Sequence, residues 1–277
     1  LMESNCGRIV VLPHETAEHR GYVQDDLYFW ELLPWSHDDP IAYGQPDLET
    51  VCATMLALAE MHAAVETFPV VEHPLGTSAV CRRTFHALNR FKEIDLSQMM
   101  LQLDGLQYHP ELQIPARRTT QLAMGAIDNA LTLLHRSMRL PVRMQPCFGR
   151  IMRENVRLEG TELAYFDDIL EMTVDSPAND IARLLGSLAG NDSWLWIAGL
   201  NAYQMIRPLS DNERYLVVAL DRGLNLLEGL SWTKRLISGS GYREPDLPRI
   251  IDRMTDIASR LAFFGKTADP DCCFEYH

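Results

Sequence analysis

A pair of carboxylates and a nearby amide are the residues of this chain whose types and spacing best suit chemistry. Asn155 opens a short β-forming run, the turn Glu159-Gly160 follows, and a second run from Leu163 to Phe166 ends in Asp167 and Asp168. This order predicts a short hairpin with two carboxylates at its outer end. Carboxylates in such a place can bind a cation or move protons. On this pattern alone, however, an exposed turn is the simpler explanation.

Three other patterns that suggest chemistry have simpler structural explanations. The run His14-Glu15-Thr16-Ala17-Glu18-His19 separates its histidines by five positions, whereas a zinc-binding helix needs a separation of four, so we expect a surface loop. Gly265-Lys266-Thr267 ends like a phosphate loop, but Arg260 stands where the first glycine would fall, and a helix C-cap is expected. His62 lies on an apolar helical stripe, which favours a buried core histidine over a catalytic base.

The composition of the chain argues against several classes of function. The 277 residues contain 25 Lys and Arg against 38 Asp and Glu, a formal charge of −13, which disfavours a general binder of nucleic acid or of anionic membranes. The longest apolar stretches are far shorter than the roughly 20 residues of a membrane span, and no basic-then-apolar leader is present. Because the six cysteines show no C-x-x-C spacing, we expect a reduced, cytoplasmic protein.

The elements that must position these residues change in type along the chain. β-Forming residues in Arg8–Pro13 and Gly21–Pro34, with Asp25-Asp26 as a turn, predict a small hairpin near the start. From Pro46 onward apolar residues recur every three or four positions, which predicts a long helix with one buried face, formed by Leu48, Val51, Met55, Leu58 and Met61. Further helical patterns cover about 78–92, 117–138, 177–189, 193–206, 210–236 and 245–263.

Several segments, taken in order, resemble the aminoglycoside phosphotransferase, choline kinase and homoserine kinase superfamily. The catalytic loop of that superfamily reads H-G-D-x-x-x-x-N and is followed by a hairpin and I-D-F/D. The matching segments are P-C-F-G-R-I-M-R-E-N-V at 146–156, F-D-D at 166–168, S-P-A-N-D-I-A-R-L-L-G at 176–186, F-W-E-L-L-P-W at 29–35, L-A-L-A-E-M-H at 56–62, A-Y-Q at 202–204, and R-P-L-S at 207–210 with Glu213. The resemblance covers almost the whole chain and is strongest to the bacterial branch called the phosphotransferase enzyme family.

The resemblance implies an α+β, protein-kinase-like fold with two parts. Residues 1–35 would form a small, partial, β-rich N-lobe and the hinge, and residues 36–277 a mainly helical C-lobe that contains the catalytic-type hairpin. The metal-binding asparagine of the family falls on Asn155. The metal-binding aspartate falls on Asp168, counted back from Asp180, with Asp167 as the alternative register. Asp180 matches an aspartate that holds the backbone of the catalytic loop.

Two departures from the family pattern affect the expected activity. Arg150 stands where the family has its catalytic aspartate, and Phe148 replaces the histidine; an arginine stays protonated and cannot act as a general base near neutral pH. Glu154 is a nearby carboxylate that could substitute, although a solvated loop residue is the simpler role. The first lysine of the chain, Lys92, comes after the hinge. The sequence is therefore either part of a longer protein or lacks the lysine that holds nucleotide phosphates in these kinases.

The function implied by the resemblance is transfer of the ATP γ-phosphate to a hydroxyl of a small polar metabolite, with ATP and Mg²⁺ as cofactors. The backbone C=O of Glu31 and N–H of Leu33 would read the edge of the adenine base. Neither a nucleic acid nor a membrane is expected as a partner. Since Arg150 replaces the catalytic carboxylate, we expect impaired transfer. The alternative is a non-catalytic, pseudokinase-like module that keeps a ligand pocket or a partner surface.

Overall fold

The computed structural model describes residues 9–34, 46–66, 74–105, 110–159, 162–167, 172–239 and 247–265. The helices are α1 Leu48–Val65, α2 Ala79–Glu93, α3 Leu96–Asp104, α4 Pro110–Ser137, α5 Ala178–Ala189, α6 Ser193–Ile206, α7 Asp211–Ser238 and α8 Leu247–Phe264. The strands are β1 Val23–Asp25, β2 Tyr28–Trp30, β3 Leu75–Gly76, β4 Val142–Arg143, β5 Gln145–Cys147, β6 Val156–Glu159, β7 Glu162–Phe166 and β8 Thr173–Asp175, with a 3-10 turn at Arg153–Asn155 before β6.

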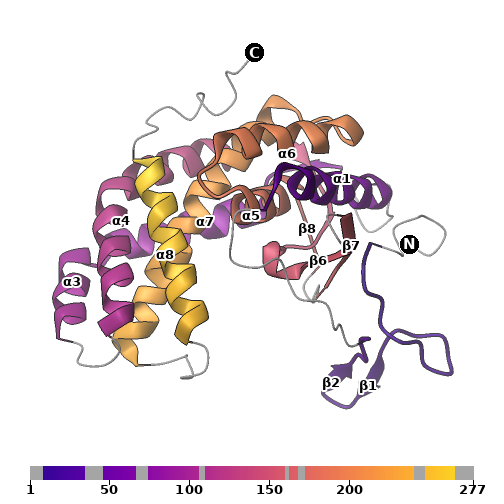
Figure 1. Ribbon diagram of the computed structural model, residues 1–277, viewed down its shortest axis with the longest axis horizontal. Helices are drawn as coiled ribbons and strands as arrows, with labels where there is room; N and C mark the ends of the chain where they lie inside the picture. The colour runs from indigo at the N-terminus through magenta and orange to yellow at the C-terminus, as the bar shows by residue number, and fades with distance from the viewer. Residues whose placement is uncertain are drawn as a thin grey trace.

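Helices form most of the molecule and pack around α7. In Figure 1, α3, α4 and α8 lie on one side of α7, while α1 and α6 cover the other end above the strands β6 to β8. The large apolar cluster of the core takes residues from both of these helix groups, and a smaller one lies between α3, α4, α7 and α8. This layout leaves the start of α5 beside the strands, where the segments resembling a catalytic loop meet.

Helix α1 shows how the sequence builds this core. It begins at the N-cap Asp47, whose carboxylate accepts a hydrogen bond from the backbone N–H of Thr50 at 2.8 Å. The expected apolar stripe is buried from Val51 to Met61, but Leu48 is exposed because it lies in the first turn, outside the contact with α6. A Cβ at Gly199 of α6 would lie 3.1 Å from Val51 of α1 and 2.6 Å from Leu185 of α5, so the glycine allows α6 to approach both helices closely.

By length and composition, α1 is the one described helix that is apolar enough to span a membrane. More than half of it is buried inside the structure, and it packs along α6 and against α5. Those contacts are the ones expected of a core helix, which passes the same test of hydropathy.

The described strands form four antiparallel pairs: β1 with β2, β3 with β4, β5 with β8, and β6 with β7. The predicted catalytic-type hairpin is confirmed as β6 and β7, in which Val156 pairs with Phe166. The chain near the N-terminus adds to it, because the N–H of Phe166 donates to the carbonyl of Ile9 and Val10 forms a parallel bridge to Phe166.

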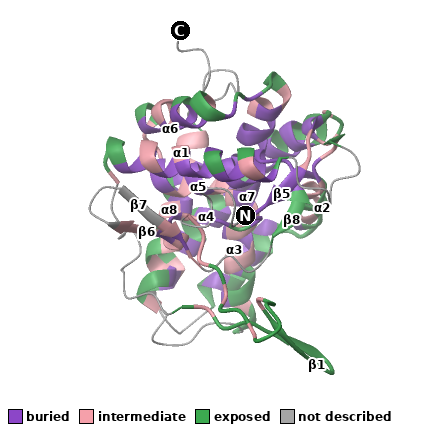
Figure 2. Ribbon diagram, turned by 90° about the vertical axis from the view of Figure 1, so that its right-hand side faces the viewer, coloured by how far each residue is buried: buried purple, intermediate pink, exposed green. Residues whose placement is uncertain are grey.

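The hairpin predicted near the start of the chain is also confirmed, as β1 and β2. All six strand residues are exposed, and Figures 1 and 2 show the pair projecting from the edge of the molecule, away from the buried core. Residues 35–45 lie outside the described residues, so the boundary between 1–35 and 36–277 stays a prediction.

The sequence patterns located most helices but not all of them. The helices expected from residues 78, 177, 193, 210 and 245 begin within two residues of those positions, as α2, α5, α6, α7 and α8. Helix α3 was not predicted, and α4 begins at Pro110 rather than at 117. The reason is Pro115, which lies inside α4: a proline early in a helix removes one backbone donor, and the packing of α4 on α7 and α8 compensates for that loss.

A buried ion network fixes the start of α7 to the strands. Glu213 forms the expected capping box with Ser210 and accepts two hydrogen bonds from Arg143 of β4, at 3.0 and 2.8 Å. Arg207 lies 3.5 Å from the same carboxylate, and both Arg207 and Glu213 are almost fully buried. Burial raises the pKa of Glu213, but the hydrogen bonds from Arg143 and Ser210 outweigh this effect and hold the pKa below its ordinary value.

We predict that Glu213→Gln lowers the free energy of unfolding by about 2–3 kcal/mol at neutral pH, because the buried Arg207 and the half-buried Arg143 lose their buried counter-charge and keep only the more exposed Glu66. The folded-state pKa is below the unfolded one, so the unfolded chain binds more protons and stability falls as the pH drops through and below about 4.5. Urea unfolding at several pH values should show a weaker acid dependence in the variant. Asp211→Asn, at an exposed ion pair of the same helix, should change little; equal losses in the two variants would contradict the prediction.

Candidate active-site loop and cavity

Asp180 fixes the loop that resembles a catalytic loop. It lies in the first turn of α5, is fully buried, and accepts hydrogen bonds from the backbone N–H groups of Phe148 at 2.6 Å and Gly149 at 2.8 Å. The side-chain amide of Asn179 donates to the carbonyl of Gly149 at 2.9 Å. Gly149 has a φ of 80°, a backbone conformation that a residue with a Cβ adopts only with strain. The start of α5 therefore determines the shape of the loop.

His62 belongs to the same buried cluster. Its Nε2 lies 3.2 Å from a carboxylate oxygen of Asp180, and its Nδ1 lies 2.8 Å from the hydroxyl of Tyr203. Since a carboxylate only accepts, Nε2 must carry a hydrogen, and in the neutral ring Nδ1 then accepts from the tyrosine hydroxyl. The expectation of a buried core histidine is confirmed, and its role is to support Asp180.

The ligand atoms of His62, Cys147 and Asp180 lie within 4.8 Å of one another, a spacing that could hold a metal ion. The contacts favour a structural cluster instead. Burial raises the pKa of the Cys147 thiol, which donates to the carbonyl of Asp175 at 3.3 Å, whereas a metal needs the thiolate. Both oxygens of Asp180 are already occupied by the loop and His62.

Arg150 follows directly after the two anchored residues, and its side chain is exposed. Phe148, at the histidine position of the family pattern, is buried and contacts the rings of His62 and Phe166, with centroid distances of 6.4 and 5.7 Å. An apolar ring thus packs beneath the loop at this position. Position 150 can therefore carry an arginine without any change in the residues that anchor the backbone.

Asn155 and Asp167, two of the expected metal ligands, lie on adjacent segments. The N–H of Asp167 donates to the carbonyl of Asn155 at 2.8 Å, and the side-chain oxygen of Asn155 accepts from the N–H of Met152 at 2.9 Å. Asp168, the preferred candidate from the sequence, lies outside the described residues. The carboxylate of Asp167 pairs with Arg157 at 2.9 Å. Oxygen ligands suited to Mg²⁺ are present, but a cation of the chain already compensates the charge of Asp167.

The structure describes both hinge residues that are expected to contact a nucleotide. Glu31 is exposed and Leu33 is half-buried. The carbonyl of Leu32, between them, accepts a hydrogen bond from the N–H of His14 at 2.8 Å. Lys92 lies in α2 and pairs with Asp128 at 2.6 Å, so it belongs to the helical lobe. Because residues 9–34 contain no lysine, the described part of the chain does not supply the cation that these kinases use for nucleotide phosphates.

The run His14 to His19 forms an exposed loop, as expected. Its histidine ring at position 19 pairs with Glu15 at 2.9 Å, and the loop is closed by a hydrogen bond from the N–H of Thr16 to the carbonyl of Arg20. His19 and Glu15 are both substantially exposed. Residues 14–19 form no helix, so they do not form a zinc-binding helix.

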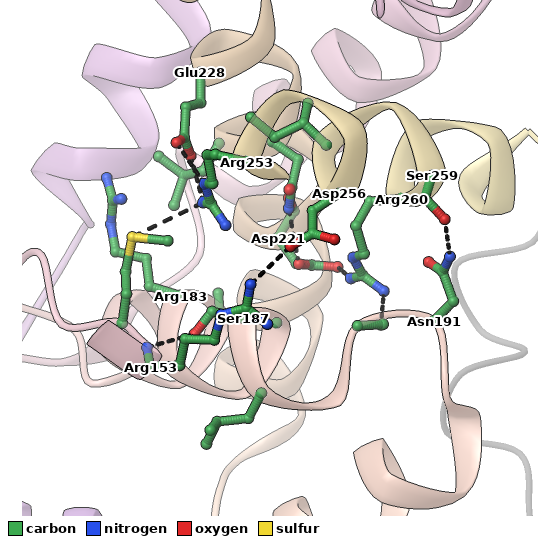
Figure 3. Close-up of a pocket in the computed structure, with 18 of the residues that line it drawn as sticks. Arg153, Arg183, Ser187, Asn191, Asp221, Glu228, Arg253, Asp256, Ser259 and Arg260 are labelled. Atoms are coloured by element: carbon green, nitrogen blue, oxygen red, sulfur yellow. Dashed lines mark hydrogen bonds and ion pairs between the residues drawn. The ribbon is translucent and has the colours of Figure 1, made fainter. Parts of the chain in front are cut away.

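A cavity of about 460 Å³ lies between the loop and helices α5, α7 and α8. Figure 3 shows charged side chains from these elements pointing toward one another around it. Arg153 pairs with Asp256 at 2.8 Å, Arg253 pairs with Glu228 at 2.7 Å, and Arg260 pairs with Asp221. Met152 and Arg153, from the loop between Arg150 and Asn155, form one wall. A cavity of this size suits a small molecule.

Arg183 also lines the cavity but was not singled out from the sequence. Its Nε donates to the side-chain oxygen of Asn179 at 3.3 Å, which ties it to the helix turn that anchors the loop. Burial lowers the pKa of Arg183, and the charges of Arg150 and Arg253 act in the same direction. The sequence could have indicated Arg183 through its spacing from Asn179, because positions 179 and 183 lie one helical turn apart on the same face of α5.

Comparison with known proteins places the fold in a defined class. No protein-family profile and no curated protein matches the sequence. Among solved structures, an aminoglycoside phosphotransferase from Alicyclobacillus acidocaldarius is similar over 96% of this chain and 78% of that chain, with 18% identity and a TM-score of 0.64. A spectinomycin phosphotransferase, solved with ADP and spectinomycin, is similar over 95% of this chain and 79% of that chain, with 13% identity and a TM-score of 0.61.

The chain therefore has the kinase-like fold of the small-molecule phosphotransferases. The resemblance to the aminoglycoside phosphotransferase and choline kinase superfamily is confirmed at the level of the fold, as is the α+β fold class with a mainly helical C-lobe.

We predict that Asp180→Asn lowers the free energy of unfolding by about 1–3 kcal/mol, because an amide has one acceptor oxygen where the loop and His62 require two. Asp128→Asn is the matched control, since its carboxylate pairs with Lys92 on the surface and contributes little. Urea unfolding monitored by circular dichroism measures both values. If Asp180→Asn were as stable as the control, the carboxylate would not hold the loop.

Proposed function

We propose that this protein binds a small polar molecule in the cavity beside the loop and transfers phosphoryl groups no faster than a trace rate. The observation that carries the proposal is Arg150, which occupies the catalytic position of a loop whose backbone is still held by Asp180. The site keeps its scaffold, while the group that would accept or orient a hydroxyl proton is replaced by a permanent cation.

The size of the effect follows from the chemistry of the loop. General-base assistance by a positioned group contributes about 10²–10⁴-fold to a rate. Binding does not need a general base. The small-molecule substrate of the spectinomycin phosphotransferase, with which this chain shares its fold, supports a small polar ligand of this kind.

The second candidate function is ATP-dependent phosphoryl transfer to a hydroxyl of a small metabolite, with Glu154 as the carboxylate. Its support is positional, because Glu154 lies in the same loop and its charge acts on Arg253 at the cavity. In that case Glu31 and Leu33 would read the adenine base, and Asn155 with Asp167 or Asp168 would bind Mg²⁺. The two candidates differ in turnover, which a single reversion can test.

We predict that the wild-type chain hydrolyses or transfers ATP phosphate at a trace rate across a panel of hydroxylated compounds. Arg150→Asp restores a carboxylate at the catalytic position and should raise the rate if a nucleotide binds at all, whereas Glu154→Gln should leave the wild-type rate unchanged. Release of ADP, followed by a coupled assay, measures all three proteins. Robust wild-type turnover that Glu154→Gln abolishes would refute the binding proposal and establish the second candidate.

For the metal site we favour Asp167 over Asp168, because the hydrogen bond between Asp167 and Asn155 brings their segments together. We predict that Asp167→Asn weakens Mn²⁺ binding and that Arg157→Gln strengthens it, since that change removes the competing cation from the carboxylate. Asp168→Asn, with the same change of charge one residue along, should have little effect. Water-proton relaxation titrations measure the affinities. A loss caused by Asp168→Asn alone would instead support the register expected from the sequence.

A further inference from the structure

Four arginines and four carboxylates line the cavity beside the loop, and one of the arginines makes no direct contact with any of these carboxylates. Arg153, Arg253 and Arg260 each form an ion pair with an acidic residue that also lines the cavity. Within the described part of the chain, Arg183 makes no ion pair, and its hydrogen-bond partner is the neutral side chain of Asn179. In Figure 3, dashed lines join the other labelled arginines to their partners, and none joins Arg183 to the residues drawn.

The surroundings of Arg183 partly oppose its charge. The side chain is half-buried, and burial lowers its pKa. Two further cations, Arg150 and Arg253, lie close enough to lower its pKa, which opposes the stabilising charges of Glu228 and Asp180. The charge of Arg253 is compensated by Glu228, whereas Arg150 is exposed at the turn of the loop with no ion pair in the described residues.

We propose that the cavity takes a ligand that carries a carboxylate or phosphate group, and that Arg150 and Arg183 together hold this group. The inference rests on the proposed binding function and names the chemical class of its ligand. A guanidinium presents parallel N–H donors that match the oxygens of both kinds of anion. The anion would supply a directly bound counter-ion for Arg183, which no described carboxylate of the chain provides.

The position of the two arginines gives this anion a defined place. Arg183 is fixed through Asn179 to the carbonyl of Gly149, and Arg150 is the next residue of the same loop. The anionic group would therefore lie at the loop end of the cavity, near the position where a catalytic aspartate would meet a substrate hydroxyl. The rest of the ligand would extend toward α7 and α8, where the paired charges and Ser259 offer polar contacts.

Isothermal titration calorimetry of the full chain at low ionic strength tests this proposal, with inorganic phosphate and succinate as probes. Ethanolamine and sorbitol are the cationic and neutral comparison compounds. We expect both anions, or at least one of them, to bind, and binding to weaken about tenfold or more in Arg183→Gln and in Arg150→Gln. Arg136→Gln, an exposed arginine of α4, is the matched control and should bind as the wild type does.

The possible outcomes distinguish a phosphorylated ligand from a carboxylate ligand. They also distinguish failure of the anion-binding inference from failure of the proposed binding function. Binding of phosphate alone indicates a phosphorylated ligand, and binding of succinate alone indicates an acidic metabolite; either result supports the inference if both variants weaken it. Anion binding that neither arginine variant weakens overturns it, as does the absence of anion binding. If sorbitol or ethanolamine binds instead, the binding function survives without its anionic ligand. Arg150→Gln changes an exposed residue, so its effect is read in a folded protein.

Discussion

The carboxylate of Asp180 is the group on which the rest of the site depends. It is fully buried, and removing a carboxylate from water is unfavourable unless its oxygens are paired. Two backbone N–H groups of the loop and the ring of His62 supply those partners. This one requirement brings together α5, the strand β5 that leads into the loop, α1 through His62, and α6 through Tyr203. The loop cannot move away without leaving the charge unpaired.

The same arrangement explains how the chain can keep a kinase-like fold with a changed catalytic position. The two loop residues that Asp180 anchors, Phe148 and Gly149, come before position 150, and the side chain at 150 is exposed. That side chain can therefore vary without loss of the scaffold. Arg150 lies near Arg183, and neither forms an ion pair within the described residues. Such a site is suited to holding an anionic group, whereas phosphoryl transfer to a hydroxyl needs a carboxylate.

The sequence predicted those parts of the molecule whose signals are local. The spacing of apolar residues predicted α1, and the capping box predicted the start of α7. Two β-forming runs around a turn predicted the hairpin β6–β7. Helix α3 is short, and the start of α4 contains Pro115, so tertiary packing rather than propensity decides both. The order of short motifs, rather than any single motif, identified the fold class.

Long-range partners could not be predicted in the same way. Asp180 was expected to anchor the loop from the family pattern, but its contact with His62, 118 residues earlier, depends on how α1 packs against α5. That Arg183 makes no ion pair within the described residues likewise depends on which of the acidic residues on α7 and α8 reach the other arginines. The preference for Asp167 over Asp168 rests on the hydrogen bond from Asp167 to the carbonyl of Asn155, a contact across the hairpin that the sequence does not give.

Amide hydrogen exchange at Phe148 and Gly149, resolved by nuclear magnetic resonance, tests most directly whether Asp180 holds the loop whatever residue occupies position 150. We expect slow exchange for both amides in the wild type, because each donates to a buried carboxylate, and equally slow exchange in Arg150→Asp. Exchange as fast as that of the exposed loop at His14 to His19, or a loss of protection caused by the change at 150, would contradict this expectation.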